Sequence, residues 1–284
     1  MKLPNDLSSL WDRLTRSEKA ALVPPAQFWD FYQQRPHGSE LPVIVRYPRT
    51  PTESQGSRNT CVCFATAWAI ELCFLRRYSQ RILLSKQYAN WLFMADDNRG
   101  WCDETLRLVD GIRILATRGI CLDVDCSYPA SRDVCLKLPI DRPSAEAVSR
   151  AIFGVSKYTV IDKLGFNGPS ICNVKYLEFI LVQGFDIVLT FDRARHDKRV
   201  LEETGIWDVI YRESGFPEPP ESSHAVLIVG YDRSGNVPYF ICKDSRGEFG
   251  APVEGYTRLS YDYLRTYASY GVVVLDVSDS MPTT

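Results

Sequence analysis

The run Cys61–Tyr78, CVCFATAWAIELCFLRRY, constrains the fold more than any other part of the chain. Apolar or small residues occupy nearly every face of a helix built from this run, until Arg76. A helix that is hydrophobic all round is a buried helix. We therefore expect Cys61–Tyr78 to be the central helix of the first half of the chain, with Thr60 immediately before it acting as the N-cap.

The pattern changes along the chain from helical to extended. Further helices are predicted at 85–95, 104–116, 143–153 and 174–183. Short β-branched or aromatic runs between turn residues predict strands at 185–191, 224–231, 238–243, 256–259 and 271–277. The sequence thus predicts an α+β chain, with a helical half at 41–150, a β-rich half at 151–277 and a flexible tail at 278–284.

The N-terminal extension, 1–40, carries a short amphipathic stripe followed by an aromatic cluster, Phe28, Trp29, Phe31 and Tyr32. Aromatic clusters usually pack in a core or an interface. The extension is therefore expected either to pack as a docking segment or to cover a cleft as a pro-segment.

Charge and cysteine usage limit the class of protein. Lys and Arg number 33 against 35 Asp and Glu, so no basic excess predicts a nucleic acid partner. No apolar run reaches the ~18 residues of a membrane span, and charges interrupt the first thirty residues, so neither a membrane partner nor a secretory signal is expected. Nine cysteines, an odd number, suit a reducing compartment. We expect a cytoplasmic location, with delivery by a route that needs no signal left open.

One histidine has an environment that suits chemistry. His224 begins the apolar run HAVLIVGY, and the loop Asp232–Asn236 predicts a hairpin with the run at 238–243. A hairpin centred on Ser234 sets His224 opposite Asp244, close enough for the carboxylate to accept a hydrogen bond from the imidazole. Such a pair is either structural or one part of a catalytic group.

A histidine oriented by a carboxylate becomes a catalyst when it meets a nucleophile. Cys61 is the best candidate among the cysteines, because it opens the buried helix. Free N–H groups and the positive end of the helix dipole at that position favour a thiolate. The alternative, a small buried hydrophobic residue, applies to the other eight cysteines.

The segments around these residues resemble the papain-like cysteine peptidases, especially their bacterial forms. The segment Gln55–Ala65, QGSRNTCVCFA, is similar to the family's block around the catalytic cysteine. Segments 223–231 and 239–247 are similar to its blocks around the catalytic histidine and the orienting asparagine. The resemblance spans about 40–277 in the family's order, and three ordered blocks are far more specific than one motif.

This resemblance implies a helical half packed on an antiparallel, barrel-like half, with the active-site cleft between them. It implies Cys61 as nucleophile, His224 as acid and base, Asp244 as orienting residue and Gln55 as an oxyanion donor. Gly100 and Trp101 lie roughly where related enzymes bind the substrate backbone. The implied partner is a protein or peptide substrate, with no cofactor and no metal, and the oligomeric state is left open.

Three positions depart from the family pattern. Asp244 stands where the family has an asparagine, and should stabilise an imidazolium more strongly than an amide would. Arg246 replaces a tryptophan that shields the histidine, and is placed to pair with Asp244. Arg58 occupies the site of a cysteine that forms a disulfide in many secreted members.

Three functions remain open from the sequence. The first is peptide-bond hydrolysis through a thioester. The second passes the same acyl group to an amine, as in a transferase, ligase or deamidase. The third is a catalytically inactive binding module, because a fold does not guarantee its chemistry.

Overall fold

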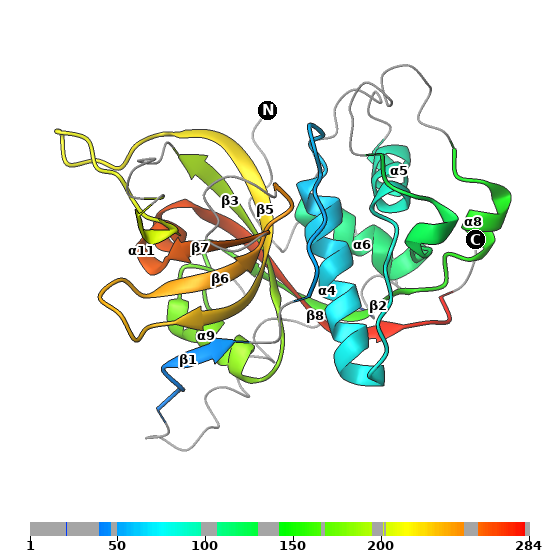
Figure 1. Ribbon diagram of the computed structural model, residues 1–284, viewed down its shortest axis with the longest axis horizontal. Helices are drawn as coiled ribbons and strands as arrows, with labels where there is room; N and C mark the ends of the chain where they lie inside the picture. The colour runs from blue at the N-terminus through cyan, green and yellow to red at the C-terminus, as the bar shows by residue number, and fades with distance from the viewer. Residues whose placement is uncertain are drawn as a thin grey trace.

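The computed structural model describes residue 21 and residues 40–46, 50–97, 107–129, 142–165, 168–194, 201, 203–246 and 255–281. Helices gather on one side of the molecule and most of the sheet on the other (Figure 1). The helical side contains α4 (Cys61–Tyr78), α5 (Lys86–Asp97), α6 (Leu108–Arg118), the 3-10 turn η1 (Asp123–Asp125) and α8 (Ala145–Ser149). The extension 1–40 lies outside the described residues apart from residues 21 and 40.

Helix α4 is the central helix that the sequence predicts. It contacts α5 and α6 on one side and strands β3, β5 and β8 on the other. Trp68 and Ile70 in its middle have no exposed surface. Ser79, in a left-handed conformation, ends the helix. Although α4 is apolar, no helix within the described segments is both long and apolar enough to cross a membrane.

The strands form one sheet of antiparallel pairs with a single parallel pair, β4 with β7, among the described residues. They are β1 (Ile44–Arg46), β2 (Gly154–Asp162), β3 (Ile187–Ala194), β4 (Ile206–Trp207), β5 (Pro220–Asp232), β6 (Tyr239–Lys243), β7 (Tyr256–Ser260) and β8 (Ala268–Ser278). Their order is β2-β8-β3-β5-β6-β7-β4, and β1 pairs with β5. The α+β class is confirmed, but the sheet is open and does not close into a barrel.

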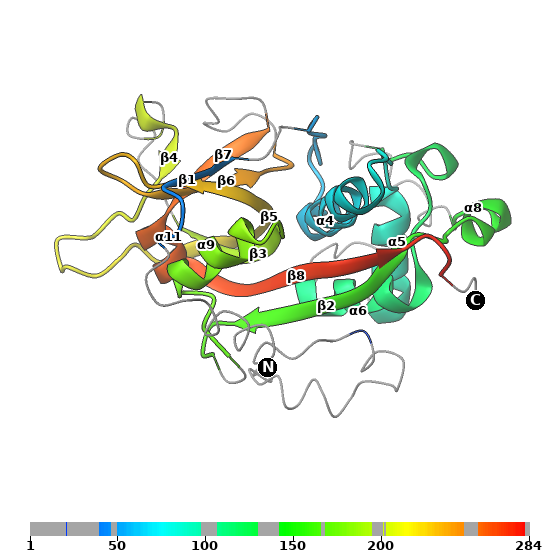
Figure 2. The ribbon, with the colours of Figure 1, turned by 90° about the horizontal axis from the view of Figure 1, so that it is seen from below.

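Strands β2 and β8 join the two sides of the molecule. Figure 2 shows them as a long ribbon that runs beneath both the helices and the rest of the sheet. Val160 and Val272 belong to the hydrophobic cluster of the helical side, whereas Ile161 and Val273, their neighbours in sequence, belong to the second cluster. The second cluster also contains residues of α9 (Val174–Val182) and α11 (Tyr261–Tyr267). Alternate residues of one ribbon therefore serve two cores.

The hairpin formed by β5 and β6 differs from the predicted register. Ile228 lies opposite Cys242 and Leu227 opposite Lys243, and an irregularity between Ile228 and Gly230 shifts the rest of the ladder by one residue. The predicted pairing of His224 directly opposite Asp244 is therefore wrong. The ladder ends at Leu227 and Lys243, so β5 continues to His224 beyond the end of β6.

All seven cysteines within the described segments are free thiols. Five of them are fully or half buried in the first cluster around α4, and the other two, Cys172 and Cys242, lie in the second. Apolar burial raises the pKa of the Cys121 thiol to about 12 and that of Cys242 well above its usual range. The Cys121 and Cys242 thiols are thus held in their neutral, unreactive form.

Gly230 lets β1 dock on β5. A Cβ atom at this position would lie 2.3 Å from the carbonyl oxygen of Val45 in β1. We predict that Gly230→Ala lowers the free energy of unfolding by about 1–3 kcal/mol, because the two strands must move apart. Urea unfolding measures this loss. Gly235→Ala is the matched control, since no atom lies within 4 Å of its added Cβ, and equal stability of the two variants would contradict the prediction.

Candidate active site

Cys61 is the first residue of α4 and is half buried. The helix begins here because the apolar run starts at this residue and Thr60 precedes it in a non-helical conformation. The sequence predicts that the Thr60 side chain caps the helix, but it makes no capping hydrogen bond. Its hydroxyl instead forms a 2.6 Å hydrogen bond with the Tyr128 hydroxyl. The Cys61 thiol thus stands at a helix N-terminus that has no side-chain cap, where a negative charge is stabilised.

His224 and Asp244 meet although their strands do not pair at that point. The distance between His224 Nε2 and Asp244 Oδ1 is 2.8 Å. Continued beyond its last pair, Leu227 with Lys243, the register sets Asp244 opposite Val226, two residues from His224 on the same face of the ribbon, a diagonal that long side chains span. Asp244 is held in turn, because its backbone N–H donates to Gly255 O over 2.8 Å.

The His224 ring is almost completely enclosed. Its side chain is 2% exposed, and the Phe191 ring packs against it edge-on at 5.8 Å. Burial alone lowers the pKa of His224, but the Asp244 carboxylate and the Cys61 thiol outweigh burial and raise the pKa to about 10. Asp244 holds Nε2, and Nδ1 has no hydrogen-bond partner of ordinary geometry in the described part of the chain. Nδ1 is therefore the ring atom that can exchange a proton with Cys61.

Gln55 is anchored on both sides of the site. Its backbone N–H donates to Ser245 O over 2.8 Å, and its Oε1 accepts a 2.6 Å hydrogen bond from the Ser245 hydroxyl. Its Nε2 donates to the Arg58 carbonyl over 2.5 Å. A carboxamide nitrogen carries two N–H donors, and within the described part of the chain one acceptor faces it, the Arg58 carbonyl, so the second N–H can face a ligand.

The remaining predicted residues have different outcomes. Gly100 and Trp101 lie outside the described residues, so their role in substrate binding stays a prediction. Arg246 contacts Asp244 through its backbone N–H, which donates to Oδ1 over 3.0 Å. No side-chain ion pair joins these two residues, although both are described. Arg246 therefore supports the carboxylate and leaves it free to face His224.

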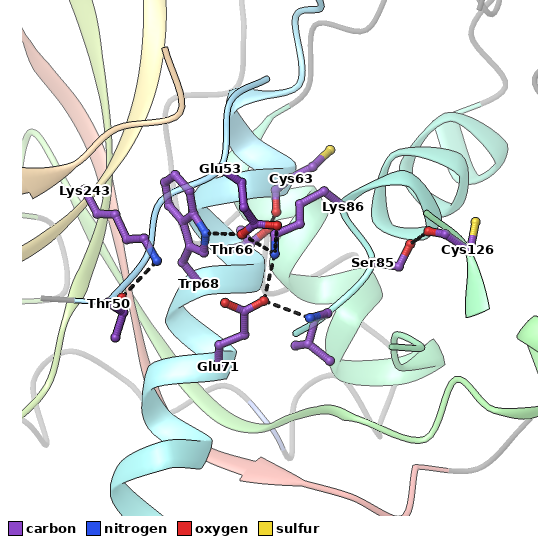
Figure 3. Close-up of polar contacts among 11 residues, drawn as sticks. Thr50, Glu53, Cys63, Thr66, Trp68, Glu71, Ser85, Lys86, Cys126 and Lys243 are labelled. Carbon is purple, nitrogen blue, oxygen red and sulfur yellow. Dashed lines mark hydrogen bonds and ion pairs between the residues drawn. The ribbon is translucent and has the colours of Figure 1, made fainter. Parts of the chain in front are cut away.

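A cluster of charged side chains joins α4, α5 and the segment before α4 (Figure 3). Lys86 of α5 has no exposed surface, and its ammonium lies 2.7 Å from a Glu53 carboxylate oxygen and 2.8 Å from Glu71 Oε1. Glu71 also accepts the backbone N–H of Leu84. Burial raises the pKa of Glu71 despite the attraction of Lys86. The cluster thus fixes α4, α5 and the segment leading to Gln55 relative to one another.

Trp68 and Lys243 extend this cluster to the sheet. The Trp68 indole N–H donates to Glu53 over 3.0 Å, and the Lys243 ammonium lies 4.4 Å from the centre of the Trp68 ring. Lys243 Nζ also donates to the Thr50 hydroxyl over 3.0 Å. Burial lowers the pKa of Lys243 to about 8. Because Lys243 immediately precedes Asp244, the cluster connects the carboxylate of the site to the helix that begins with Cys61.

Known cysteine proteases resemble this chain in sequence. Residues 191–272, which include His224 and Asp244, match the model of the papain family cysteine proteases. The chain is 26% identical over 230 residues to a viral cathepsin of Cydia pomonella granulosis virus, covering 79% of this chain and 59% of that protein. The chain is thus similar to the papain-family cysteine peptidases. It spans only 46% to 59% of the length of the curated viral cathepsins it matches.

Solved structures support the same fold. Xylellain, a cysteine protease from Xylella fastidiosa, aligns with a TM-score of 0.66 and 20% identity, over 82% of this chain and 86% of that chain. Digestive procathepsin L 3 of the Tenebrio molitor larval midgut aligns with a TM-score of 0.58 and 18% identity, over 89% and 74% of the two chains. The papain-like fold predicted from the sequence is confirmed.

Several residues that support this papain-like site cannot be identified from the sequence alone. Ser245 and Tyr128 contact Gln55, and Glu53, Lys86 and Trp68 form the buried cluster. One signal was present, because Glu71 is the sole acidic residue in the apolar run Cys61–Tyr78. A carboxylate inside an apolar helix requires a buried partner. The identity of that partner depends on how α5 packs, which no local pattern reveals.

We predict that Lys86→Met lowers the free energy of unfolding by about 3–5 kcal/mol, because it leaves two carboxylates facing each other in a buried site. Urea unfolding measures the change. Arg150→Met is the control, since Arg150 is exposed and its ion pairs with Asp125 and Glu146 are worth about 0–1 kcal/mol each. A loss as small as that of the control would show that the cluster does not hold the helices together.

We also predict that Asp244→Asn lowers the pKa of His224 from about 10 by about 1–3 units, because the carboxylate charge that stabilises the imidazolium is removed. NMR titration of the ring protons measures this directly. The chain has three histidines, and the His224 signal is the one that disappears in His224→Gln. Asp262→Asn, at an exposed carboxylate paired with Arg265, is the control. An unchanged midpoint in Asp244→Asn would show that the carboxylate does not set the charge of the ring.

Proposed function

We propose that the protein is a cysteine peptidase that hydrolyses peptide bonds through a thioester. One observation carries this proposal. Cys61, His224 and Asp244 come from the start of α4, from β5 and from the residue after β6; Asp244 Oδ1 lies 2.8 Å from His224 Nε2, and the Cys61 thiol is close enough to help raise the pKa of His224. The relationship to the papain-family cysteine peptidases supports it, as does the buried amide of Gln55 beside the nucleophile.

The geometry supports a role for each group. The Cys61 sulfur attacks the scissile carbonyl, while His224 holds the thiol proton at Nδ1 and Asp244 fixes the ring through Nε2. The carbonyl oxygen, now negative, accepts hydrogen bonds from the Cys61 backbone N–H and from Nε2 of Gln55. When the C–N bond breaks, the proton on Nδ1 passes to the leaving amine and a thioester remains.

The second step releases the acid. Water attacks the thioester as Nδ1 of His224 takes one of its protons, and the C–S bond breaks to return the sulfur to Cys61. Because Asp244 is charged where the family has an asparagine, the imidazolium is stabilised over a wider range of pH. We propose a protein or peptide as substrate, and neither a nucleic acid nor a membrane as partner.

We also propose that the protein acts in a reducing compartment, as the sequence predicts. All seven cysteines within the described segments are free thiols, which supports a cytoplasmic location. A thiol nucleophile acts without added reductant in such a compartment.

The decisive test compares Cys61→Ala with the wild-type protein on a peptide library. We expect Cys61→Ala to lose at least about 10³-fold in kcat, because no nucleophile remains. Cys172→Ala is the matched control, since Cys172 is a free thiol in another part of the fold and its loss leaves the site intact. Equal hydrolysis by wild type and Cys61→Ala would overturn the proposal.

Mass spectrometry of the products, with and without an added amine, separates hydrolysis from acyl transfer. Hydrolysis gives a carboxylic acid in both samples. A product that carries the amine in place of water would assign the protein to the transferases, and labelling of Cys61 by a thiol-reactive probe without any turnover would favour a binding module.

Gln55→Ala tests the oxyanion role. We predict that kcat falls about 10²–10³-fold with little change in KM, because the lost donor acts on the charged intermediate. Steady-state kinetics measure the two constants. Gln80→Ala, at an exposed residue beyond the end of α4, is the control. A fall in kcat no larger than that of the control would remove Gln55 from the catalytic machinery.

A further inference from the structure

Arg58 lies in the short segment between the oxyanion donor Gln55 and the nucleophile Cys61. Its side chain is long and charged, yet the residue is only 1% exposed. Arginine is almost never fully buried unless its guanidinium has partners. The mechanism described above gives Arg58 no role.

The guanidinium is fixed by groups from two other parts of the helical half. Arg58 Nη1 donates to Gln87 Oε1 of α5 over 2.7 Å and to the Pro129 carbonyl over 3.1 Å. Its central carbon lies 4.6 Å from the centre of the Tyr128 ring. A planar guanidinium can stack and donate in its own plane at once, which an ammonium cannot do. These contacts fix the side chain on three partners.

The backbone of the same residue contacts Gln55. Gln55 Nε2 donates to the Arg58 carbonyl over 2.5 Å, and the Arg58 N–H lies 3.4 Å from the Gln55 carbonyl. The Tyr128 hydroxyl donates to the same Gln55 carbonyl over 2.9 Å and contacts the Thr60 hydroxyl. The residue that anchors the segment therefore also supplies the acceptor that orients the Gln55 amide.

We propose that Arg58 is a positioning residue for the oxyanion site. Its guanidinium fixes the Arg58 peptide group, and that carbonyl holds one N–H of Gln55 Nε2 so that the other faces the oxygen of the reacting carbonyl. The inference rests on the proposed peptidase function and adds a residue to it. Arg58 performs through hydrogen bonds and stacking the anchoring that a disulfide would perform in a chain with cysteine at this position.

The first test is steady-state kinetics of Arg58→Met and Arg58→Lys. We expect kcat to fall about 10-fold to 10²-fold in Arg58→Met, with KM changed less than about 3-fold, because the Gln55 donor acts on the intermediate. Arg58→Lys recovers part of the loss, since an ammonium can donate to one acceptor but cannot reach all three partners. Arg265→Met is the matched control at an exposed arginine. Unchanged kcat in Arg58→Met would overturn the proposal.

A double-mutant cycle asks whether Arg58 acts through Gln55. In the Gln55→Ala background we expect Arg58→Met to reduce kcat by no more than about 3-fold, because the group it orients is already absent. Independent effects that multiply in the double variant would overturn the proposed route through Gln55.

Two milder variants, at Gln87, test the same anchoring in case Arg58→Met does not fold. Gln87→Leu removes one acceptor of the guanidinium, whereas Gln87→Glu keeps an oxygen at that position. We expect kcat to fall in Gln87→Leu and to be retained in Gln87→Glu, with thermal unfolding measured for both. The opposite order would contradict the proposed anchoring.

Hydrogen exchange separates this inference from the peptidase function. In Arg58→Met we expect faster amide exchange within 55–60 than in wild type, and unchanged exchange within β5. If the wild-type protein cleaves no peptide, the peptidase function fails, and this measurement alone decides whether Arg58 positions the segment. Identical exchange in both proteins would overturn the positioning role whether or not the protein is active.

Discussion

The buried ammonium of Lys86 is the interaction on which the placement of the site depends. It joins Glu53, two residues before Gln55, to Glu71 of α4, and Trp68 carries the connection to Lys243 beside Asp244. Burying these charges is costly, and apolar residues of the same shape often stabilise a core equally well. The charges make the packing specific, because an ammonium donates hydrogen bonds, and a carboxylate accepts them, only from partners at particular positions. The three segments that carry Cys61, Gln55 and Asp244 are held in one arrangement for that reason.

The fold follows from the sequence where burial is complete or periodicity is long. The apolar run at 61–78 identified α4 to the residue, and the five predicted strands all exist. Strand β2 was missed because polar residues interrupt its apolar residues and because it follows a weak helical pattern. That pattern proved to be the five-residue helix α8. The long β2–β8 ribbon depends on pairing across more than 100 residues, which no local pattern specifies.

The candidate site shows both the strength and the limit of local patterns. The register predicted for the β5–β6 hairpin was wrong, because the turn is centred between Gly235 and Asn236 and not on Ser234, so that Asp232 lies opposite Tyr239. His224 and Asp244 nevertheless form the predicted hydrogen bond, since Asp244 lies on the same face of the ribbon. The sequence motif identified Gln55 and Cys61, because the spacing between these two residues is short and fixed. Ser245, Tyr128 and Lys86 escaped notice because their importance arises from contacts between distant segments.

The contacts of Arg58 have a consequence for chemistry in a reducing medium. A thiol enzyme needs reductant to keep its sulfur from oxidising, yet the same reductant cleaves disulfides that brace the active site. A reductant does not break the hydrogen bonds and the aromatic contact that hold the Arg58 guanidinium. The segment that leads to Cys61 is thus held by contacts that are not broken by conditions that keep the Cys61 thiol reduced.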